Sequence, residues 1–275
     1  MAGVTAGFVG LGNIGKPMAL RLAAADDVEL WVHDIAPEPV ADLLAAGAKQ
    51  AGSVAELARE VDVLCVMVRD DDQVRAVAED VDRDTVLVIH STVAPGTPAE
   101  LADRGLTVLD APVSGGPMGA ADGSLAIMVG GPEGAFAAAQ PVLELMGSKV
   151  VHAGDLGAGT RMKLARNLIH FVAFTAVTEA QRLAEAAGLD LVALGDVVRH
   201  TDAITGGPGA IMHRATTAPI PAGDFWRGVF EHVRALGEKD LSLAIALAEE
   251  LGVDVPLAEL AIDRLGPGLG LPEED

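Results

Sequence analysis

The sequence predicts a doubly wound α/β sheet domain followed by an all-helical domain, joined by a long helix. Over the first half of the chain, short runs rich in β-branched residues alternate with helical patterns, which is typical of a parallel sheet covered by helices. After about residue 155 the strand patterns stop and the apolar residues follow helical spacing. A glycine-rich turn lies between the first expected strand and the first expected helix.

The expected elements of the first domain, residues 1–156, follow from these patterns. Helices at 17–25 and 39–46 each have a proline near the first turn, where it is well tolerated. The strands are expected at 7–10, 28–33, 63–68, 85–90, 107–110, 125–130 and 149–152.

The second domain, residues 157–275, is expected to begin with a long helix over about 159–187 that ends at Gly188. This helix is apolar on nearly every side, which predicts that it is buried. The glycine- and proline-rich segment 205–224 is expected to be mostly loop. The variable loop 201–224 is expected to help decide which acid is used. Further helices are expected at 191–200, 225–251 and 256–265.

Composition and charge exclude several functional classes. The chain has 275 residues, with 40 acidic against 19 basic side chains and a net charge of −21. This field repels nucleic acid and anionic membranes, and 3% aromatic residues leave few surfaces on which bases could stack. The apolar segment 168–177 is too short to span a bilayer.

The single cysteine and the start of the chain bear on location. Cys65 lies in an apolar run, which favours a buried structural thiol and excludes an intrachain disulfide or a cysteine-built metal site. The first residues lack a basic region followed by an apolar one. A cytoplasmic protein is therefore expected.

The glycine-rich turn has the spacing G-x-G-x-x-G. Gly10 would allow the tight turn, Gly12 the approach of a pyrophosphate, and Gly15 close packing of helix on strand. Because the motif follows a strand and opens a helix, it predicts a Rossmann-type nucleotide site lined also by Leu11, Asn13 and Ile14. The alternative is a glycine turn that binds no nucleotide.

Asp34 ends the second expected strand, where a carboxylate would accept hydrogen bonds from an adenosine ribose. It would repel a 2′-phosphate, and no Arg or Lys follows it closely. NAD is therefore favoured, with NADP left open. The alternative is that Asp34 caps a turn.

The run G-A-G-T-R-M-K-L-A-R-N, residues 157–167, places Lys163 and Asn167 four positions apart, on one face of a helix. A lysine transfers protons near neutral pH only where burial or a neighbouring charge lowers its pKa. Taken alone, the pair also fits a solvated helix face.

Further motifs fall in a recognisable order along the chain. They are M-V-R-D-D-D-Q-V at 67–74, S-T-V-A-P-G-T at 91–97, D-A-P-V-S-G-G-P-M-G-A-A-D-G-S-L-A-I-M-V-G-G at 110–131, and E-K-D-L-S-L-A at 238–244. With the glycine turn and residues 157–167, they resemble the β-hydroxyacid dehydrogenase family, typified by 3-hydroxyisobutyrate and tartronate semialdehyde dehydrogenases. The resemblance covers almost the whole chain.

The resemblance implies roles for particular residues. Lys163 would be the general acid/base, and Asn167 would hold the reacting oxygen or the substrate. Lys239, which alone reads as a solvated helix lysine, would be contributed to the closed site by the second domain, with cofactor and substrate both in reach. The substrate carboxylate would be bound by Ser114, Gly115 and Gly116, although a plain glycine turn is the alternative there. The cofactor loops would include Met67, Val68, Ser91 and Thr92, with Thr92 also beside the substrate.

The expected activity is transfer of hydride between NAD(P) and a small anionic β-hydroxy acid or its semialdehyde, without a metal. Within the resemblance, the retained Lys163 argues against imine reduction. No glutamate stands three or four residues beyond Asn167, where His170 lies instead, to support a decarboxylating mechanism. A reductase of an imine or larger carbonyl compound and a non-catalytic nucleotide-binding regulator remain the alternatives. A homodimer or homotetramer is expected.

Several residues have no assigned role. His170 is expected to be a core histidine. Others could shape substrate choice or serve at the surface or in packing: Arg161, Arg166, His213, Arg214 and Trp226.

Overall fold

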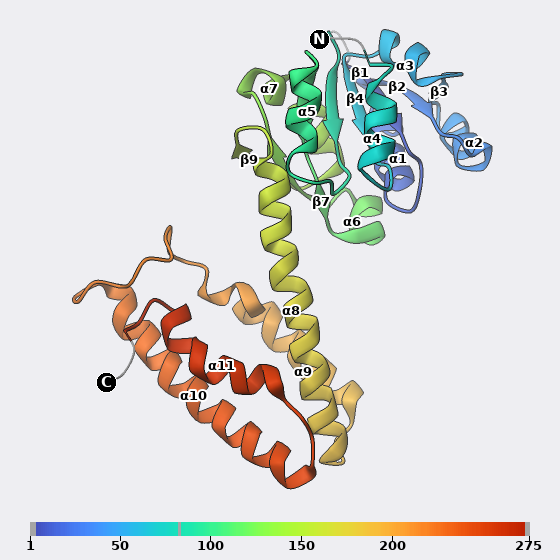
Figure 1. Ribbon diagram of the computed structural model, residues 1–275. Helices are drawn as coiled ribbons and strands as arrows, with labels where there is room; N and C mark the ends of the chain where they lie inside the picture. The colour runs from blue at the N-terminus through green and yellow to red at the C-terminus, as the bar shows by residue number, and fades with distance from the viewer. Residues whose placement is uncertain (1–3, 82–83, 273–275) are drawn as a thin grey trace. The chain divides into compact units, whose positions relative to one another are not determined.

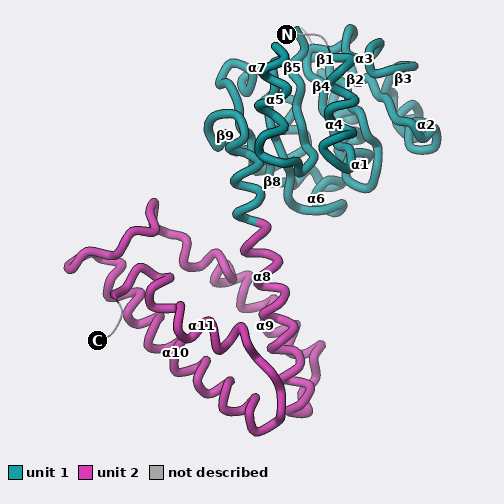
Figure 2. The backbone as a smooth tube through the Cα atoms, in the orientation of Figure 1, with its two compact units in different colours: residues 1–166 teal, residues 167–275 magenta. Residues whose placement is uncertain are grey.

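The computed structural model describes residues 4–81 and 84–272. The chain divides into two compact units, Met1–Arg166 and Asn167–Asp275 (Figure 2). The division falls within a helix that belongs to both units. It lies later than the predicted boundary between residues 156 and 157, which stays a prediction.

The described part of the first unit contains a nine-stranded sheet (Figure 1). Its strand order β3-β2-β1-β4-β5-β6 is parallel throughout, which is the order of the Rossmann fold. β8 then pairs antiparallel with β6, while β7 and β9 flank β8. The strands are β1 (Val4–Val9), β2 (Val28–His33), β3 (Lys49–Gln50), β4 (Val63–Val66), β5 (Val86–Ile89), β6 (Thr107–Asp110), β7 (Val113–Ser114), β8 (Ala126–Gly130) and β9 (Lys149–Gly154).

Helices cover both faces of this sheet because the central strands are apolar on both sides. In β4, Val63 and Cys65 join one buried cluster and Leu64 and Val66 the other. The first cluster includes α1 (Gly15–Ala23), α2 (Pro37–Ala45), α6 (Gly116–Asp122) and α7 (Glu133–Met146). The second includes α3 (Val54–Glu60), α4 (Asp71–Ala78) and α5 (Thr97–Asp103).

Cys65 is fully buried in this core. Burial raises the pKa of its thiol to about 12, because an apolar environment disfavours the thiolate. The prediction of a buried thiol is confirmed.

The structure contains two strands that the sequence does not predict, β3 and β7. In addition, β8 pairs antiparallel with β6, whereas a parallel sheet is predicted. Each of the two strands has only two residues, too few for a two-residue alternation to show in the sequence. β7 matters for the site because it carries Ser114.

The helices of the second unit begin with the later part of α8 (Ala158–Ala186). α10 (Phe225–Leu251) has the predicted bounds, and α11 (Pro256–Gly268) runs slightly beyond them. α9 (Leu191–Thr205) and the 3-10 turn η1 (Gly207–Ile211) extend into the segment predicted to be mostly loop. Glu179 of α8 accepts hydrogen bonds from the amides of Leu257 and Ala258 and so caps α11.

The prediction that α8 is buried is wrong for the single chain. Leu168 is 67% exposed, Phe171 59% and Phe174 53%. The apolar pattern correctly predicts the helix, but this chain leaves these side chains uncovered. No helix in the described ranges combines the length and apolar character that a bilayer span needs.

Candidate functional site

The three glycines of the turn at the end of β1 differ in how much space surrounds them. Gly10 has φ +92°, and a Cβ there would collide with the carbonyl oxygen of Met67. A Cβ on Gly15 would collide with the carbonyl oxygen of Gly10. Gly12, in contrast, has nothing within 4 Å of an added Cβ. The turn is therefore closed where strand meets helix and open at Gly12, as a pyrophosphate site requires.

The remaining residues of the fingerprint complete this turn. Leu11 is buried, Asn13 is exposed and Ile14 is half-buried. Ile14 is the N-cap of α1 and makes no side-chain capping hydrogen bond. No side chain of the turn thus competes with a ligand for the N-terminus of α1.

Asp34 holds the same turn from the end of β2. Its Oδ2 accepts a hydrogen bond from the Leu11 amide at 2.5 Å, and its Oδ1 accepts one from the Ala36 amide at 2.8 Å. The residue therefore does cap a turn, as one reading of the sequence expects. Each oxygen keeps a further lone pair, so the carboxylate also retains capacity to accept from a ribose hydroxyl.

Ser91 connects the ends of β4 and β5. Its buried hydroxyl donates to the Val68 carbonyl at 2.7 Å and accepts from the Val68 amide at 2.9 Å. Met67 and Val68 are half-buried, and Thr92 is exposed beside Ser91. The hydroxyl proton of Ser91 is used within the protein, so this residue shapes the loop at 67–68.

The S-G-G turn leads from β7 into α6. Gly115 has φ +135° and Gly116 has φ +64°, which side chains with a Cβ rarely adopt. The backbone therefore reverses sharply after Ser114 and presents consecutive amides at the start of a helix. Such an arrangement suits an anion.

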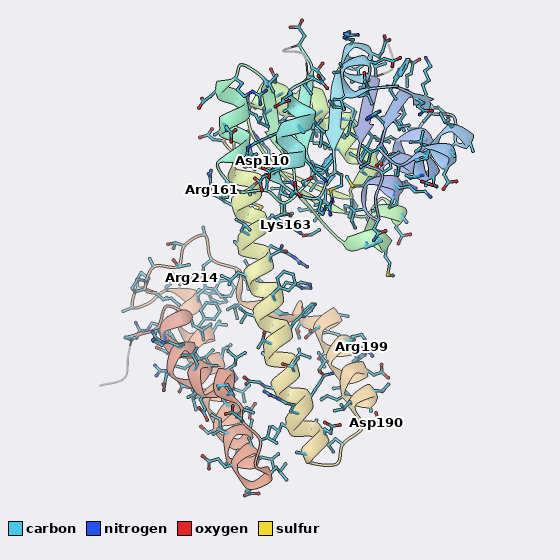
Figure 3. The ribbon with its side chains drawn as sticks, turned by 45° about the vertical axis from the view of Figure 1, so that its right-hand side comes forward. Asp110, Arg161, Lys163, Asp190, Arg199 and Arg214 are labelled. Atoms are coloured by element: carbon cyan, nitrogen blue, oxygen red, sulfur yellow. The ribbon has the colours of Figure 1, made fainter. Side chains whose placement is uncertain are left out.

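Lys163 reaches this turn from the second turn of α8 (Figure 3). It is only 8% exposed. Its Nζ donates to the Val113 carbonyl oxygen at 2.6 Å and to the Ser114 hydroxyl oxygen at 2.8 Å. An ammonium has three N–H donors, so one remains beyond these two contacts.

The environment lowers the pKa of the Lys163 ammonium below the ordinary lysine value. Burial is the larger cause, and the positive charge of Arg166 one turn away adds to it. Both disfavour the charged form, so proton exchange by Lys163 moves towards neutral pH.

The remaining predicted site residues lie in the second unit. Asn167 is half-buried on α8, four positions after Lys163. Lys239 lies on α10, where it forms an exposed ion pair with Asp240 at 2.9 Å. Their roles at the site stay predictions.

The residues without an assigned role also have defined surroundings. His170 is half-buried and its ring contacts those of Phe171 and Phe174. The rings of His213 and Trp226 stack at 5.1 Å. In addition, Arg161 is exposed and Arg214 donates to the Ala218 carbonyl.

The Val113 carbonyl that accepts from Lys163 has no signal in the sequence, because the two-residue strand β7 shows no alternation pattern. Within residues 4–81 and 84–272, no group of three or more His, Cys, Asp or Glu side chains could hold a metal ion.

Two family models cover most of the chain. Residues 5–154 match the NAD-binding domain of 6-phosphogluconate dehydrogenase, and residues 157–265 match the NAD-binding domain of NADP-dependent 3-hydroxyisobutyrate dehydrogenase. The 3-hydroxyisobutyrate dehydrogenase of Pseudomonas aeruginosa is 36% identical over 92% of this chain and 88% of that protein. The chain belongs to the β-hydroxyacid dehydrogenase family.

Solved structures of several oxidoreductases resemble this chain along its length. A crystal structure of an oxidoreductase from Mycobacterium avium 104 is 48% identical, with a TM-score of 0.94 over 98% of this chain and 100% of that one. The Mycobacterium tuberculosis 3-hydroxyisobutyrate dehydrogenase with L-serine is 32% identical, with a TM-score of 0.65 over 98% and 96%. An imine reductase from Myxococcus stipitatus, 18% identical with a TM-score of 0.75 over 98% and 96%, shares the fold. This β-hydroxyacid dehydrogenase family member is thus an NAD(P)-binding oxidoreductase.

Proposed function

We propose that this chain transfers hydride between NAD and a small β-hydroxy acid or its semialdehyde, with Lys163 as the general acid/base. The observation that carries the proposal is the buried Lys163 ammonium bound to the Ser114 hydroxyl. It puts a proton-transfer group with a lowered pKa beside a turn suited to an anion.

The cofactor would be held by the glycine turn, by Asp34, and by the loops at 67–68 and 91–92. The fit rests on the open space at Gly12 and on the uncapped start of α1. When bound, NAD supplies the hydride acceptor for oxidation, and NADH the hydride donor for reduction.

Lys163 would act on the oxygen of the reacting carbon. In oxidation its neutral amine takes the hydroxyl proton while a hydride leaves the carbon. In reduction its ammonium returns that proton to the developing alkoxide. Asn167 would orient the oxygen, and Ser114, Gly115 and Gly116 would bind the carboxylate.

NAD is the proposed cofactor because Asp34 directly follows β2, and a carboxylate after this strand would accept hydrogen bonds from the adenosine ribose. Its carboxylate is held in place by the Leu11 and Ala36 amides. A 2′-phosphate would meet this fixed negative charge, and the cost of bringing two like charges together favours NAD.

A homodimer or homotetramer is proposed for the assembled enzyme. The exposed apolar side chains of α8 include Leu168, Phe171 and Phe174. Removing such apolar surface from water is favourable, so association with a second copy of the chain would be stabilised by covering these side chains. Light scattering during size-exclusion chromatography tests this, since a monomer at micromolar concentration would contradict it.

The activity is tested by a spectrophotometric panel at 340 nm. Small β-hydroxy acids and their semialdehydes are compared with imines and larger carbonyl compounds, each with NAD(H) and NADP(H). Turnover of a β-hydroxy acid with NAD supports the proposal. Turnover of imines alone would instead indicate an imine reductase, and NADH binding without any turnover a regulator.

A further inference from the structure

Asp110 ends β6 as a fully buried carboxylate. Its Oδ1 accepts a hydrogen bond from the Gly157 amide and its Oδ2 one from the Thr160 amide, both at 2.6 Å. These amides belong to the start of α8, so Asp110 binds the positive end of that helix dipole.

The two hydrogen bonds place a strict demand on residue 110. A buried carboxylate is costly unless its oxygens are hydrogen-bonded. Here each oxygen faces a different amide, so both must be acceptors. Asparagine has the same shape, but only its oxygen could accept from one of the two amides. Its NH₂ group would face the other backbone N–H, and these two facing donors would both lack an acceptor.

The start of α8 also packs directly against the strand ends around Asp110. A Cβ on Gly130 would collide with Asp110 Oδ1, and a Cβ on Gly159 would collide with the Met128 carbonyl oxygen. The first turn of the helix therefore has little room to shift while the Asp110 hydrogen bonds are intact.

The segment 110–114 binds the start of α8 at two places. Asp110 binds the amides at 157 and 160, whereas Val113 and Ser114 accept hydrogen bonds from Lys163. Asp110 and Lys163 both lie at this end of α8 (Figure 3). The position of the lysine side chain thus depends on how the helix start is seated on residue 110.

We infer that Asp110 is a positioning residue for Lys163: its carboxylate fixes the first turn of α8, and so holds the lysine amine beside Ser114. The inference deepens the proposed function and rests on it for the role of Lys163. No group of the substrate or cofactor need touch Asp110.

The test compares Asp110→Asn with Asp190→Asn in the full-length chain. Asp190 caps α9 and accepts from two amides, Val192 and Ala193, but through Oδ1 alone. Asparagine at 190 therefore keeps both hydrogen bonds, whereas asparagine at 110 loses one and opposes two donors. The pair isolates the two-oxygen geometry from the general effect of removing a capping charge.

Two readouts are measured on each variant. With the acid that the wild type oxidises, Asp110→Asn is expected to lower kcat by about tenfold to a hundredfold, because a small misplacement of the base is costly. Its KM and its Kd for NADH should stay within about twofold. Asp190→Asn should match the wild type.

The second readout needs no turnover. Pulse labelling with acetic anhydride, followed by peptide mass spectrometry, gives the reactivity of Lys163 relative to exposed Lys149. Asp110→Asn should raise this ratio several-fold, because Lys163 loses its fixed, buried position; Asp190→Asn should not. An unchanged ratio with unchanged kcat would overturn the inference, as would parallel losses of kcat and NADH binding. If the wild type oxidises no hydroxy acid, the proposed function fails and the labelling ratio still decides the positioning.

Discussion

The Nζ of Lys163 donates a hydrogen bond to the Ser114 hydroxyl oxygen at 2.8 Å. Because an ammonium can only donate, Ser114 accepts here and its own O–H remains available to donate elsewhere. The proposed proton-transfer group and the proposed carboxylate clamp are therefore coupled. An anion that accepts from Ser114 would therefore lie close to the Lys163 side chain.

Removing the Ser114 hydroxyl should weaken substrate binding and slow turnover. Ser114→Ala is expected to raise KM for the hydroxy acid by about tenfold to a hundredfold, since a hydrogen bond to a charged group contributes about 1.5–3 kcal/mol. kcat should fall as well, because Lys163 loses one acceptor. Steady-state kinetics measure both values. Ser53→Ala, which removes the cap of α3, is the control; an unchanged KM in Ser114→Ala would exclude the clamp.

Neutralising Arg166 should move the pH dependence of oxidation. Oxidation needs the neutral amine, so kcat/KM rises with pH through the pKa of Lys163. The positive charge of Arg166 is one of the causes that lower this pKa. Arg166→Gln should therefore shift the rising limb to higher pH, whereas Arg104→Gln, an exposed arginine elsewhere, should leave it in place. A shift to lower pH would contradict the assignment of the limb to Lys163.

Neutralising Asp34 should relax the cofactor preference. Asp34→Asn removes the charge that opposes a 2′-phosphate and weakens the hold on the Leu11 amide. The ratio of kcat/KM with NADP to that with NAD is expected to rise about tenfold or more. A wild type that already prefers NADP would contradict the proposed role.

His90 should make the free energy of unfolding depend on pH. Its Nδ1 lies 2.8 Å from the Ala111 carbonyl oxygen, and burial lowers its pKa from 6.5 to about 4. The unfolded chain therefore binds this proton at a higher pH than the folded one. Folding stability is lost as pH falls from 6.5 towards 4, by up to about 3 kcal/mol.

The variant His90→Asn keeps a donor for Ala111 and cannot ionise. Unfolding in urea at several pH values should give a smaller decrease in the free energy of unfolding for this variant than for the wild type over that range. Parallel decreases for the two proteins would show that His90 does not titrate on unfolding.

Much of the fold could be predicted because strong local patterns determine it. α10 begins at Phe225 and ends at Leu251 as its apolar spacing predicts, and the three glycines of the turn have the steric surroundings that their spacing implies. β7 could not be predicted because two residues carry no periodicity. The Val113 contact of Lys163 was missed with it.

The exposure of α8 shows another limit of sequence patterns. An apolar pattern on all sides of a helix predicts that its side chains are buried, but it does not show whether the same chain or another chain buries them. Phe171 and Phe174 are more than half exposed here. The pairing of Asp110 with the start of α8 is likewise a contact across 47 and 50 positions of sequence, which no local pattern encodes.

The most direct test of the central claim is the turnover of Lys163→Met, compared with Lys149→Met as a matched control at an exposed lysine. With the hydroxy acid that the wild type oxidises, kcat of Lys163→Met should fall by about 10²–10⁴-fold, while the Kd for NADH stays as in the wild type. Lys149→Met should keep wild-type kcat. Turnover by Lys163→Met at the wild-type rate would contradict the account.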